Sequence, residues 1–339
     1  MLLQIVSIVL CLQAFQASSA ESLALFEFTR PLMGTQCRVL LYAPDETAGK
    51  AAADAAFERI AQLDRCMSDY KDDSEIMKLC HAPFGVAVQV SAELFEVLTI
   101  SQRFAEQSGG AFDVTCGPLI QLWRRARRQR ELPDLEKLEQ ARARCGYRFL
   151  KLDVKQRSVT LMKEGMRLDL GGIAKGYAAD KALETIQARG LKSALVAAGG
   201  DIATGAPPPG EEGWIVAIHP LKANATTDES PALILHDAAV STAGDAEQFM
   251  EIAGTRYSHI IDPRTGNAIV GQSSATVVAP RGVYSDGLDT ALNVLRAKEG
   301  IPMIEGTCGA AALLIVKSEH GEERFESARW KELKMQRSK

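Results

Sequence analysis

An α+β fold is the class that the sequence predicts, and three observations lead to it. Residues 50–67 place apolar side chains at three- and four-residue steps, which is the period of an amphipathic helix. Residues 193–198 form a short apolar run closed by glycines, which is typical of a buried strand. Helical and strand patterns then follow one another without a strict β-α-β rhythm, which favours α+β over a parallel α/β sheet.

The N-terminus has the pattern of a targeting segment. Residues 2–12 are almost wholly apolar but too few to span a bilayer, and Ser18, Ser19 and Ala20 precede Glu21 with small side chains. We therefore expect a signal peptide at residues 1–20, one domain over residues 21–339, and an exported, periplasmic protein. The segment lacks Lys and Arg, so a short membrane anchor or a disordered tail stays as the alternative. We expect no stable transmembrane span later in the chain.

Charge excludes one class of function. The chain of 339 residues has a net charge of −4 and no basic stripe, so no nucleic-acid partner is expected. The run at residues 124–128 is its one basic cluster, and we expect it on a solvated helix face or loop. Six cysteines follow residue 20 without the spacing of a zinc site, so disulfides and buried free thiols both stay open.

Capping signals predict two further helices in the first half of the chain. Ser91 is a favourable N-cap for a helix that reaches residue 107, where Gly109 and Gly110 end it. Residues 119–130 also carry a helical pattern, and Pro133 stops it.

The next segment alternates strands, turns and one helix. Residues 167–170 are expected to end a strand that enters a glycine turn, and a helix over residues 174–188 follows it. Residues 205–213 are rich in Pro and Gly and are expected to form a surface loop before a strand at residues 214–218.

The last third predicts a hairpin, a strand and a helix. Residues 248–252 and 256–262 read as a hairpin, and a turn at Pro263 and Gly266 follows it. Residues 275–279 read as a strand. Ser285 is expected to cap a helix that runs to about Arg296.

The densest chemical cluster runs from Asp169 to Tyr177 and contains three glycines. Glycines let the backbone turn tightly and approach a ligand closely, and the amides at the start of the following helix suit a phosphate. Lys175 adds a positive charge, although its position is not that of a Walker A lysine. A plain strand–turn–helix with a solvated lysine is the alternative interpretation.

A second cluster contains Asp286 and Thr290, four residues apart at a helix start. Their oxygens face the same way and are hard ligands of the kind that Mg²⁺ accepts. Taken alone, this cluster is more typical of an acidic first helical turn that the helix dipole favours than of a metal site.

Two more clusters carry weaker signals. Strand alternation puts Tyr257, His259 and Ile261 on one face, where His259 is a candidate general base or a structural histidine. In residues 110–115, Phe112 and Asp113 follow a turn and could grip a flat ring. The same residues could equally form a helix C-cap that enters the core.

In this order along the chain, the clusters resemble the ApbE family of FAD:protein FMN transferases, over roughly residues 31–316. No single piece is decisive, but their shared order is highly specific. The pieces are Met33-Gly34-Thr35, residues 70–76, Gly110-Ala111-Phe112-Asp113, residues 169–180, Ala198-Gly199-Gly200-Asp201, His259-Ile260-Ile261-Asp262-Pro263 and residues 286–290.

The resemblance implies an α+β fold of two intertwined subdomains with mixed sheets, and FAD in a cleft between them. It implies Mg²⁺ on Asp286, Thr290 and the carbonyl oxygen of Gly172. The implied contacts to the flavin dinucleotide are Met33, Tyr70, Ala111, Phe112, Asp113, Asp169, Lys175 and the backbone near Ile260.

The implied reaction is phosphoryl transfer. A Thr or Ser hydroxyl of a target flavoprotein attacks the FMN-side phosphorus of FAD and AMP leaves, with Asp286 acting through Mg²⁺ and His259 accepting the proton. The expected acceptor is an exported or membrane-bound flavoprotein, such as a subunit of a sodium-pumping NADH:quinone reductase. A Mg²⁺-dependent FAD pyrophosphatase and a non-catalytic periplasmic FAD-binding protein stay as alternatives.

The chain departs from the family pattern in one loop. After Ser241 and Thr242 the family often has Ser-Gly-Asp followed by an aromatic residue and an arginine, whereas here residues 243–248 read Ala-Gly-Asp-Ala-Glu-Gln. This departure affects the expected contacts of the loop to substrate or target. Cys116 also stands where a valine is usual, which indicates a packing change.

Overall fold

A computed structural model describes residues 23–218, 221, 231–244 and 249–336 of the chain, and it confirms the α+β class. The expected signal peptide at residues 1–20 lies outside these residues, as do positions 245–248 of the divergent loop.

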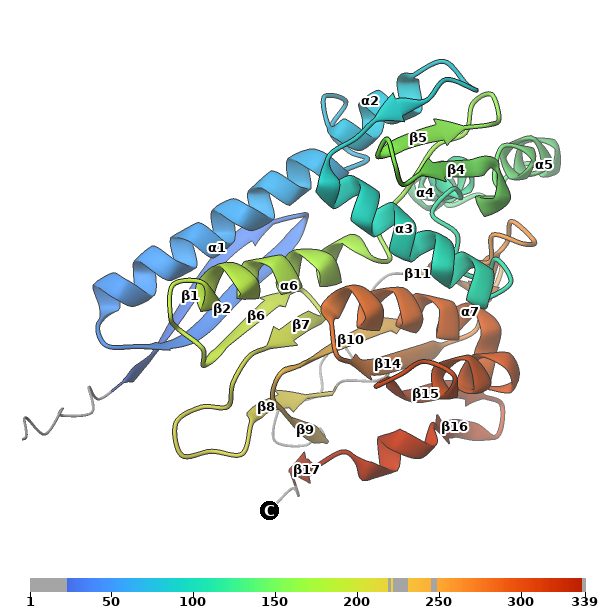
Figure 1. Cartoon of the computed structure of the whole chain (residues 1–339). Coiled ribbons are helices and arrows are strands. Elements are labelled where there is room, and N and C mark those ends of the chain that lie inside the picture. Colours follow the sequence, from blue (N-terminus) through green and yellow to red (C-terminus); the bar gives the residue numbers. More distant parts are fainter. Residues whose placement is uncertain (1–22, 219–220, 222–230, 245–248, 337–339) are drawn as a thin grey trace, which may run out of the picture.

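An eight-stranded sheet forms the centre of the molecule (Figure 1). Every ladder of the sheets in the described residues is antiparallel, so the expectation of mixed sheets is wrong in that detail. In spatial order, the strands of the eight-stranded sheet are β1 (Ala24–Leu32), β2 (Thr35–Ala43), β6 (Ala194–Ala198), β7 (Asp201–Thr204), β10 (Ala238–Gly244), β14 (Ser273–Ala279), β15 (Ala311–Ser318) and β16 (Gly321–Glu326).

Three helices lie side by side over one face of this sheet: α1 (Glu46–Met67), α6 (Ala174–Gln187) and α7 (Gly282–Glu305) (Figure 1). Their buried faces are rich in small side chains, which lets helix and sheet approach closely. α1 begins four residues before the predicted start because Asp45 caps it through the Ala48 amide. α6 matches its prediction to within one residue.

α7 begins earlier than predicted. Arg281 is its N-cap, and Ser285 is a fully buried residue of the helix rather than its cap. The predicted end at Arg296 coincides with a break, where that residue adopts φ 60° between two helical segments. Asp286 and Thr290 therefore sit inside the helix rather than at its first residues.

The opposite face of the sheet is covered by a small sheet of β8 (Trp214–Ala217), β9 (Ala232–Leu235) and β17 (Met335–Gln336). Trp214 and Leu233 pack there with Leu313 of the central sheet and with Trp330 of the short 3₁₀ helix η2 (Ala328–Glu332). The predicted strand at 214–218 and the loop at 205–213 are confirmed.

The remaining elements gather beyond one end of the helical layer (Figure 1). Ser91 caps its predicted helix through the Leu94 amide, and the helix predicted over residues 119–130 begins two residues early. These elements are α2 (Glu75–His81), β3 (Val88–Gln89), α3 (Ala92–Gln107), α4 (Gly117–Gln129), α5 (Leu135–Ala143), the 3₁₀ helix η1 (Tyr147–Phe149), β4 (Leu150–Asp153) and β5 (Ser158–Leu161).

The predicted hairpin is also present, as β11 (Phe249–Ile252) and β12 (Thr255–Ile261), with β13 (Ala268–Val270) as a third strand. The strand end predicted at residues 167–170 is wrong: only Arg167 makes a single bridge, to Cys116. The backbone there turns at once toward α6, because Asp169 bonds to the amide of Gly171.

The described residues contain free cysteines and no helix suited to cross a membrane. The six cysteines there are all free thiols: Cys37, Cys66, Cys80, Cys116, Cys145 and Cys308. None of the helices in the described ranges combines the length and the apolar character that crossing a bilayer requires.

Candidate active site

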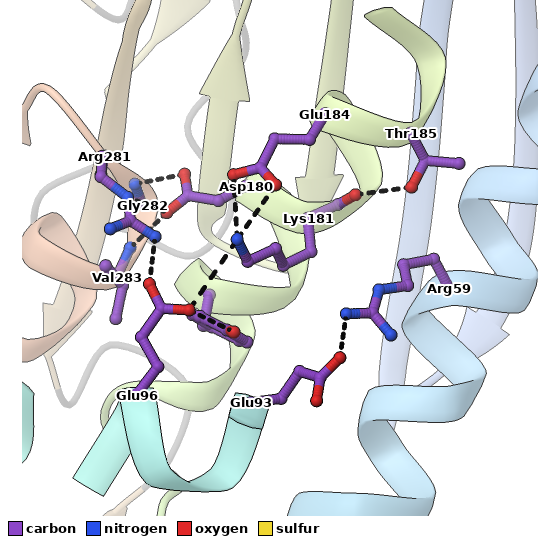
Figure 2. A network of polar contacts seen from close by, with 11 residues as sticks. Arg59, Glu93, Glu96, Asp180, Lys181, Glu184, Thr185, Arg281, Gly282 and Val283 are labelled. Carbon is purple, nitrogen blue, oxygen red and sulfur yellow. Dashed lines mark hydrogen bonds and ion pairs between the residues drawn. The ribbon is translucent and has the colours of Figure 1, made fainter. Parts of the chain in front are cut away.

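The N-termini of α6 and α7 are capped by carboxylates that each helix lends to the other. Asp286 of α7 accepts the Gly176 amide of α6 at 2.8 Å. Asp180 of α6 accepts the Gly282 and Val283 amides of α7 at 2.6 and 3.1 Å (Figure 2). Neither N-cap residue makes a side-chain cap of its own, so each helix depends on the other for its first turn.

Two glycines allow this close contact. A Cβ atom on Gly176 would lie 2.1 Å from the Gly282 carbonyl oxygen, and one on Gly282 would lie 2.4 Å from the Gly176 carbonyl oxygen. Backbone meets backbone at these positions, so no side-chain adjustment could make room. We call this contact, with the turn at Gly172 that leads into α6 and with Thr290 of α7, the α6–α7 junction.

The three predicted Mg²⁺ ligands meet at this junction. Asp286 is buried and one helical turn from Thr290, which is half-buried. A Cβ atom on Gly172 would lie 2.9 Å from the Thr290 hydroxyl oxygen, so the glycine turn lies directly against that side chain. Within the described ranges, no backbone amide donates a hydrogen bond to the Gly172 carbonyl oxygen.

The junction concentrates buried negative charge. Lys175 forms an ion pair with Asp201, while Asp286 and the fully buried Asp289 lie close by. Burial and the neighbouring Asp201 carboxylate raise the pKa of Asp286 to about 7, and burial beside Asp286 raises the pKa of Asp289 well above its ordinary value. Burial alone would lower the pKa of Lys175, but the surrounding carboxylates raise it.

This donor set fits a divalent cation. Full ionisation of three carboxylates around one ammonium group would leave excess buried negative charge; the raised pKa values oppose this ionisation, and a cation would favour it. Among the residues that the structure describes, no three His, Cys, Asp or Glu side chains are placed to hold a metal ion by themselves. A cation at the junction would therefore need the Gly172 carbonyl and the Thr290 hydroxyl, which are hard oxygen donors.

The predicted amide cradle for phosphate is wrong in part. Asp169 accepts the Gly171 amide, Leu170 accepts the next turn amides, and Asp286 accepts the Gly176 amide. These amides are engaged inside the protein because two carboxylates and the Leu170 carbonyl oxygen accept them. Lys175, which is one-third exposed, remains the candidate phosphate contact of this segment.

Met33 lies at the tip of the β1–β2 hairpin, beside the glycine turn between β6 and β7. Met33 and Gly34 both adopt positive φ, 50° and 70°, although only glycine favours such backbone. A Cβ atom on Gly199 would lie 2.8 Å from the Thr35 hydroxyl, so the two turns touch. Met33 therefore occupies a turn position whose backbone conformation non-glycine residues rarely adopt.

Tyr70 and Asp169 are joined by a residue that sequence reasoning missed. Arg124 of α4 donates to Asp169 at 2.8 Å, forms an ion pair with Asp69, and lies over the Tyr70 ring, 4.4 Å from its centroid. The prediction that residues 124–128 form a solvated face is therefore wrong for Arg124, whose side chain is 22 % exposed. We call Tyr70, Arg124, Asp69 and Asp169 the Tyr70 platform.

Residues 111–113 have buried side chains. Phe112 packs edge-on against Phe104 at 6.0 Å, and Ala111 is 1 % exposed. Asp113 accepts the amide and hydroxyl of Thr115 and the amide of Tyr147, and burial raises its pKa. The alternative of a helix C-cap that leads into the core therefore describes these side chains, and only their backbone is left to meet a ring.

Ile260 and His259 lie on β12 with different exposures. Ile260 is buried against Ala111 and against Val294 and Leu295 of α7, so two predicted dinucleotide contacts share one apolar cluster. His259 has an exposed side chain. The ladder to β13 is irregular between Tyr257 and Ile261, and Ile261 is buried, so the predicted common face of Tyr257, His259 and Ile261 is interrupted.

Sequence reasoning gave no role to three further acidic residues of the junction. Asp201 stands in the Gly199-Gly200-Asp201 segment and Asp289 stands between the two predicted α7 ligands, so both positions offered a signal. Asp180 offered none, because the amides that it caps are 102 and 103 residues away.

Comparison with known families gives one result over most of the chain. The ApbE family model matches residues 33–314. A protein of Treponema pallidum named FAD:protein FMN transferase is 33% identical over 91% of this chain and 90% of its own length. A Klebsiella pneumoniae protein of the same name is 30% identical over 85% of this chain and 83% of its own length.

Solved structures agree with these sequences. The flavin transferase ApbE from Vibrio cholerae superposes with a TM-score of 0.81 at 27% identity, covering 92% of this chain and all of its own. The flavinyl transferase ApbE of Pseudomonas stutzeri gives the same TM-score at 29% identity, covering 92% of this chain and 97% of its own.

Proposed function

This chain belongs to the ApbE family and is a FAD:protein FMN transferase, and we propose that the α6–α7 junction is where its phosphoryl transfer takes place. The observation that carries this proposal is the meeting of Gly172, Asp286 and Thr290 beside Lys175. These residues come from a turn and two helices that are held together by reciprocal capping.

We infer that Mg²⁺ is the cation of this site and that Gly172, Asp286 and Thr290 hold it. When bound, the ion supplies charge neutralisation for the diphosphate of FAD and for the AMP that leaves. Asp286 can serve it while its other oxygen still accepts the Gly176 amide, because that hydrogen bond uses Oδ2 alone.

The chain's own residues position the reacting groups and neutralise the charge of the diphosphate. A Thr or Ser hydroxyl of the acceptor attacks the FMN-side phosphorus, the bond to the AMP oxygen breaks, and FMN becomes linked to the acceptor through its phosphate. Lys175 places a positive charge beside this diphosphate, and Asp201 fixes the position of that ammonium group. Such a reaction depends on placement more than on covalent help.

His259 is the proposed general base for the acceptor hydroxyl. Its side chain is exposed on β12, where an incoming acceptor could reach it, and β12 also carries Ile260 of the proposed dinucleotide contacts.

The acceptor follows from the reaction and from the targeting pattern at residues 1–20. We propose that the enzyme is exported to the periplasm, where it modifies a flavoprotein that carries a Thr or Ser acceptor motif. A subunit of a membrane NADH:quinone reductase, or of a related electron-transfer complex, is the acceptor class that we would test first.

The decisive experiment uses purified enzyme, FAD, Mg²⁺ and a candidate acceptor domain. We expect a fluorescent acceptor band after denaturing electrophoresis, and a mass increase of one FMN on a Thr or Ser peptide. The control replaces that Thr or Ser by Ala and should abolish the band. FMN and AMP released in the absence of acceptor would support the FAD pyrophosphatase alternative, and FAD binding without either product would support the carrier alternative.

A further inference from the structure

Arg124 connects three segments that are far apart in the sequence. Its guanidinium group donates to Asp169 at 2.8 Å and pairs with Asp69, while its central carbon lies over the ring of Tyr70. The carboxylates are 11 % and 4 % exposed, so these ion pairs are shielded from solvent and stronger than surface pairs. Arg124 thereby ties α4 to the segment after α1 and to the turn before α6.

The Tyr70 ring is exposed and yet held in place. It is 75 % exposed, and the contact with Arg124 lies 4.4 Å from its centroid. An aromatic side chain on the surface ordinarily samples several rotamers, and ordering it on ligand binding costs free energy. Arg124 reduces that cost because its cation–π contact holds the ring before a ligand arrives.

The Asp169 carboxylate depends on Arg124 for its charge. Burial and the nearby Asp69 carboxylate raise the pKa of Asp169 to about 6, and Arg124 opposes that rise. The other oxygen of Asp169 accepts the Gly171 amide at 2.8 Å, which fixes the turn that carries Gly172. A lysine could supply the charge but not the planar fork that serves two carboxylates and one ring together.

We propose that Arg124 is a positioning residue for the flavin dinucleotide, which holds the Tyr70 ring and the Asp169 carboxylate where they meet FAD. This inference rests on the proposed function, because Tyr70 and Asp169 are dinucleotide contacts only under that proposal. Arg124 acts through these two residues and is not itself a catalytic residue. Its neighbour Arg125 hydrogen-bonds Gln129 alone and is exposed, so it offers a matched control on the same helix.

The test measures FAD affinity of the purified protein by flavin fluorescence and by calorimetry. Arg124→Gln should weaken FAD binding about tenfold, because the cation–π contact and both charged hydrogen bonds are lost. Arg125→Gln should bind FAD within about twofold of wild type. In the transfer reaction, KM for FAD should rise with Arg124→Gln while kcat changes by less than about twofold, since the phosphoryl step is left intact.

A double-mutant cycle separates positioning from a general loss of structure. If Arg124 acts through Tyr70, the variant that combines Arg124→Gln with Tyr70→Ala loses less affinity than the product of the two single losses. Losses that multiply would overturn the inference. Circular dichroism checks folding, and if Arg124→Gln does not fold, Arg124→Lys is read in its place. That variant keeps the charge and should still bind FAD several-fold more weakly, about fivefold, for lack of the planar fork.

The outcomes distinguish the two proposals. Wild-type protein that binds no FAD would refute the proposed function itself. Wild-type protein that binds FAD, together with an Arg124 variant of unchanged affinity, would refute the role of Arg124 and leave the transferase assignment intact.

Discussion

The α6–α7 junction and the Tyr70 platform are built in opposite ways. At the junction, backbone lies against backbone at Gly176 and Gly282, and buried carboxylates cap both helices. At the platform, exposed Tyr70 is held by one arginine side chain. The difference teaches that the proposed phosphoryl-transfer end is fixed by main-chain packing, whereas the proposed recognition end is fixed by side chains that substitution can alter without disturbing the core.

The largest expected effect is on activity at the junction. Asp286→Asn should lower transfer about 1000-fold in saturating Mg²⁺, because a carboxylate ligand of the ion is lost. The amide oxygen of Asn can still accept the Gly176 amide, and one buried charge disappears, so thermal unfolding should occur at the wild-type temperature or above. Full activity of this variant with Mg²⁺ would show that phosphoryl transfer does not take place at the α6–α7 junction, and the contrast with the Tyr70 platform would then be wrong.

The next largest effect is on the free energy of unfolding, through the backbone contact at the α6–α7 junction. Gly176→Ala should lower the free energy of unfolding by about 3 kcal/mol, because its Cβ would lie 2.1 Å from a carbonyl oxygen that cannot move independently. Gly306→Ala is the matched control, since its Cβ would meet its nearest atoms at 3.6 Å. Urea unfolding of both variants measures the difference. Equal stabilities would show that the junction is not rigidly packed.

A pH dependence should come from the cap at Asp180, whose pKa burial raises to about 6. A carboxyl group with a raised folded-state pKa binds its proton more tightly when folded, so its stabilisation is lost as pH rises from about 4 to 6. Wild type should therefore gain about 2 to 3 kcal/mol over Asp180→Asn when pH falls from 7 to 4.

Urea unfolding of both proteins across this pH range measures the Asp180 effect. Arg281 lies 3.6 Å from the same carboxylate and also pairs with Glu96 of α3 (Figure 2). Parallel stability curves for the two proteins would show that Asp180 is ionised throughout, and the account of its burial would then be wrong.

The smallest effect concerns the reactivity of the thiols, which contrasts the buried α4–α5 region with the exposed Cys308. Burial raises the pKa of Cys145 to about 12 and that of Cys116 well above its ordinary value, whereas Cys308 is exposed. Iodoacetamide should therefore modify Cys308 first among the six described cysteines, as peptide mass spectrometry would record. Comparable labelling of Cys116 would mean that the α4–α5 region opens in solution.

Much of the fold was predictable where local pattern decides structure. The helices α1, α3 and α6 follow apolar periodicity and capping residues that are visible in the sequence. The start of α7 was not, because its cap is the distant Asp180 rather than a neighbouring side chain. The β1–β2 hairpin was missed as well, because Met33 stands where a two-residue turn ordinarily has Asn.

The site also contains residues that the sequence identifies and residues that it does not. Gly172, Asp286 and Thr290 were identified by resemblance, and the structure brings them to one junction. Arg124 could not be identified, because its partners lie 55 and 45 residues away and its own neighbours form an ordinary basic run. Long-range ion pairs leave no local signal, so this class of residue becomes visible only in the fold.

The central claim is that Gly172, Asp286 and Thr290 hold one divalent cation beside the FAD diphosphate. Crystals of the protein soaked with FAD and with Mn²⁺, an anomalous scatterer that substitutes for Mg²⁺, test it most directly. Anomalous diffraction should place one manganese ion in contact with the Gly172 carbonyl, the Asp286 carboxylate and the Thr290 hydroxyl, beside the FAD diphosphate. Manganese bound elsewhere, or FAD bound with its diphosphate remote from these three oxygens, would contradict the account.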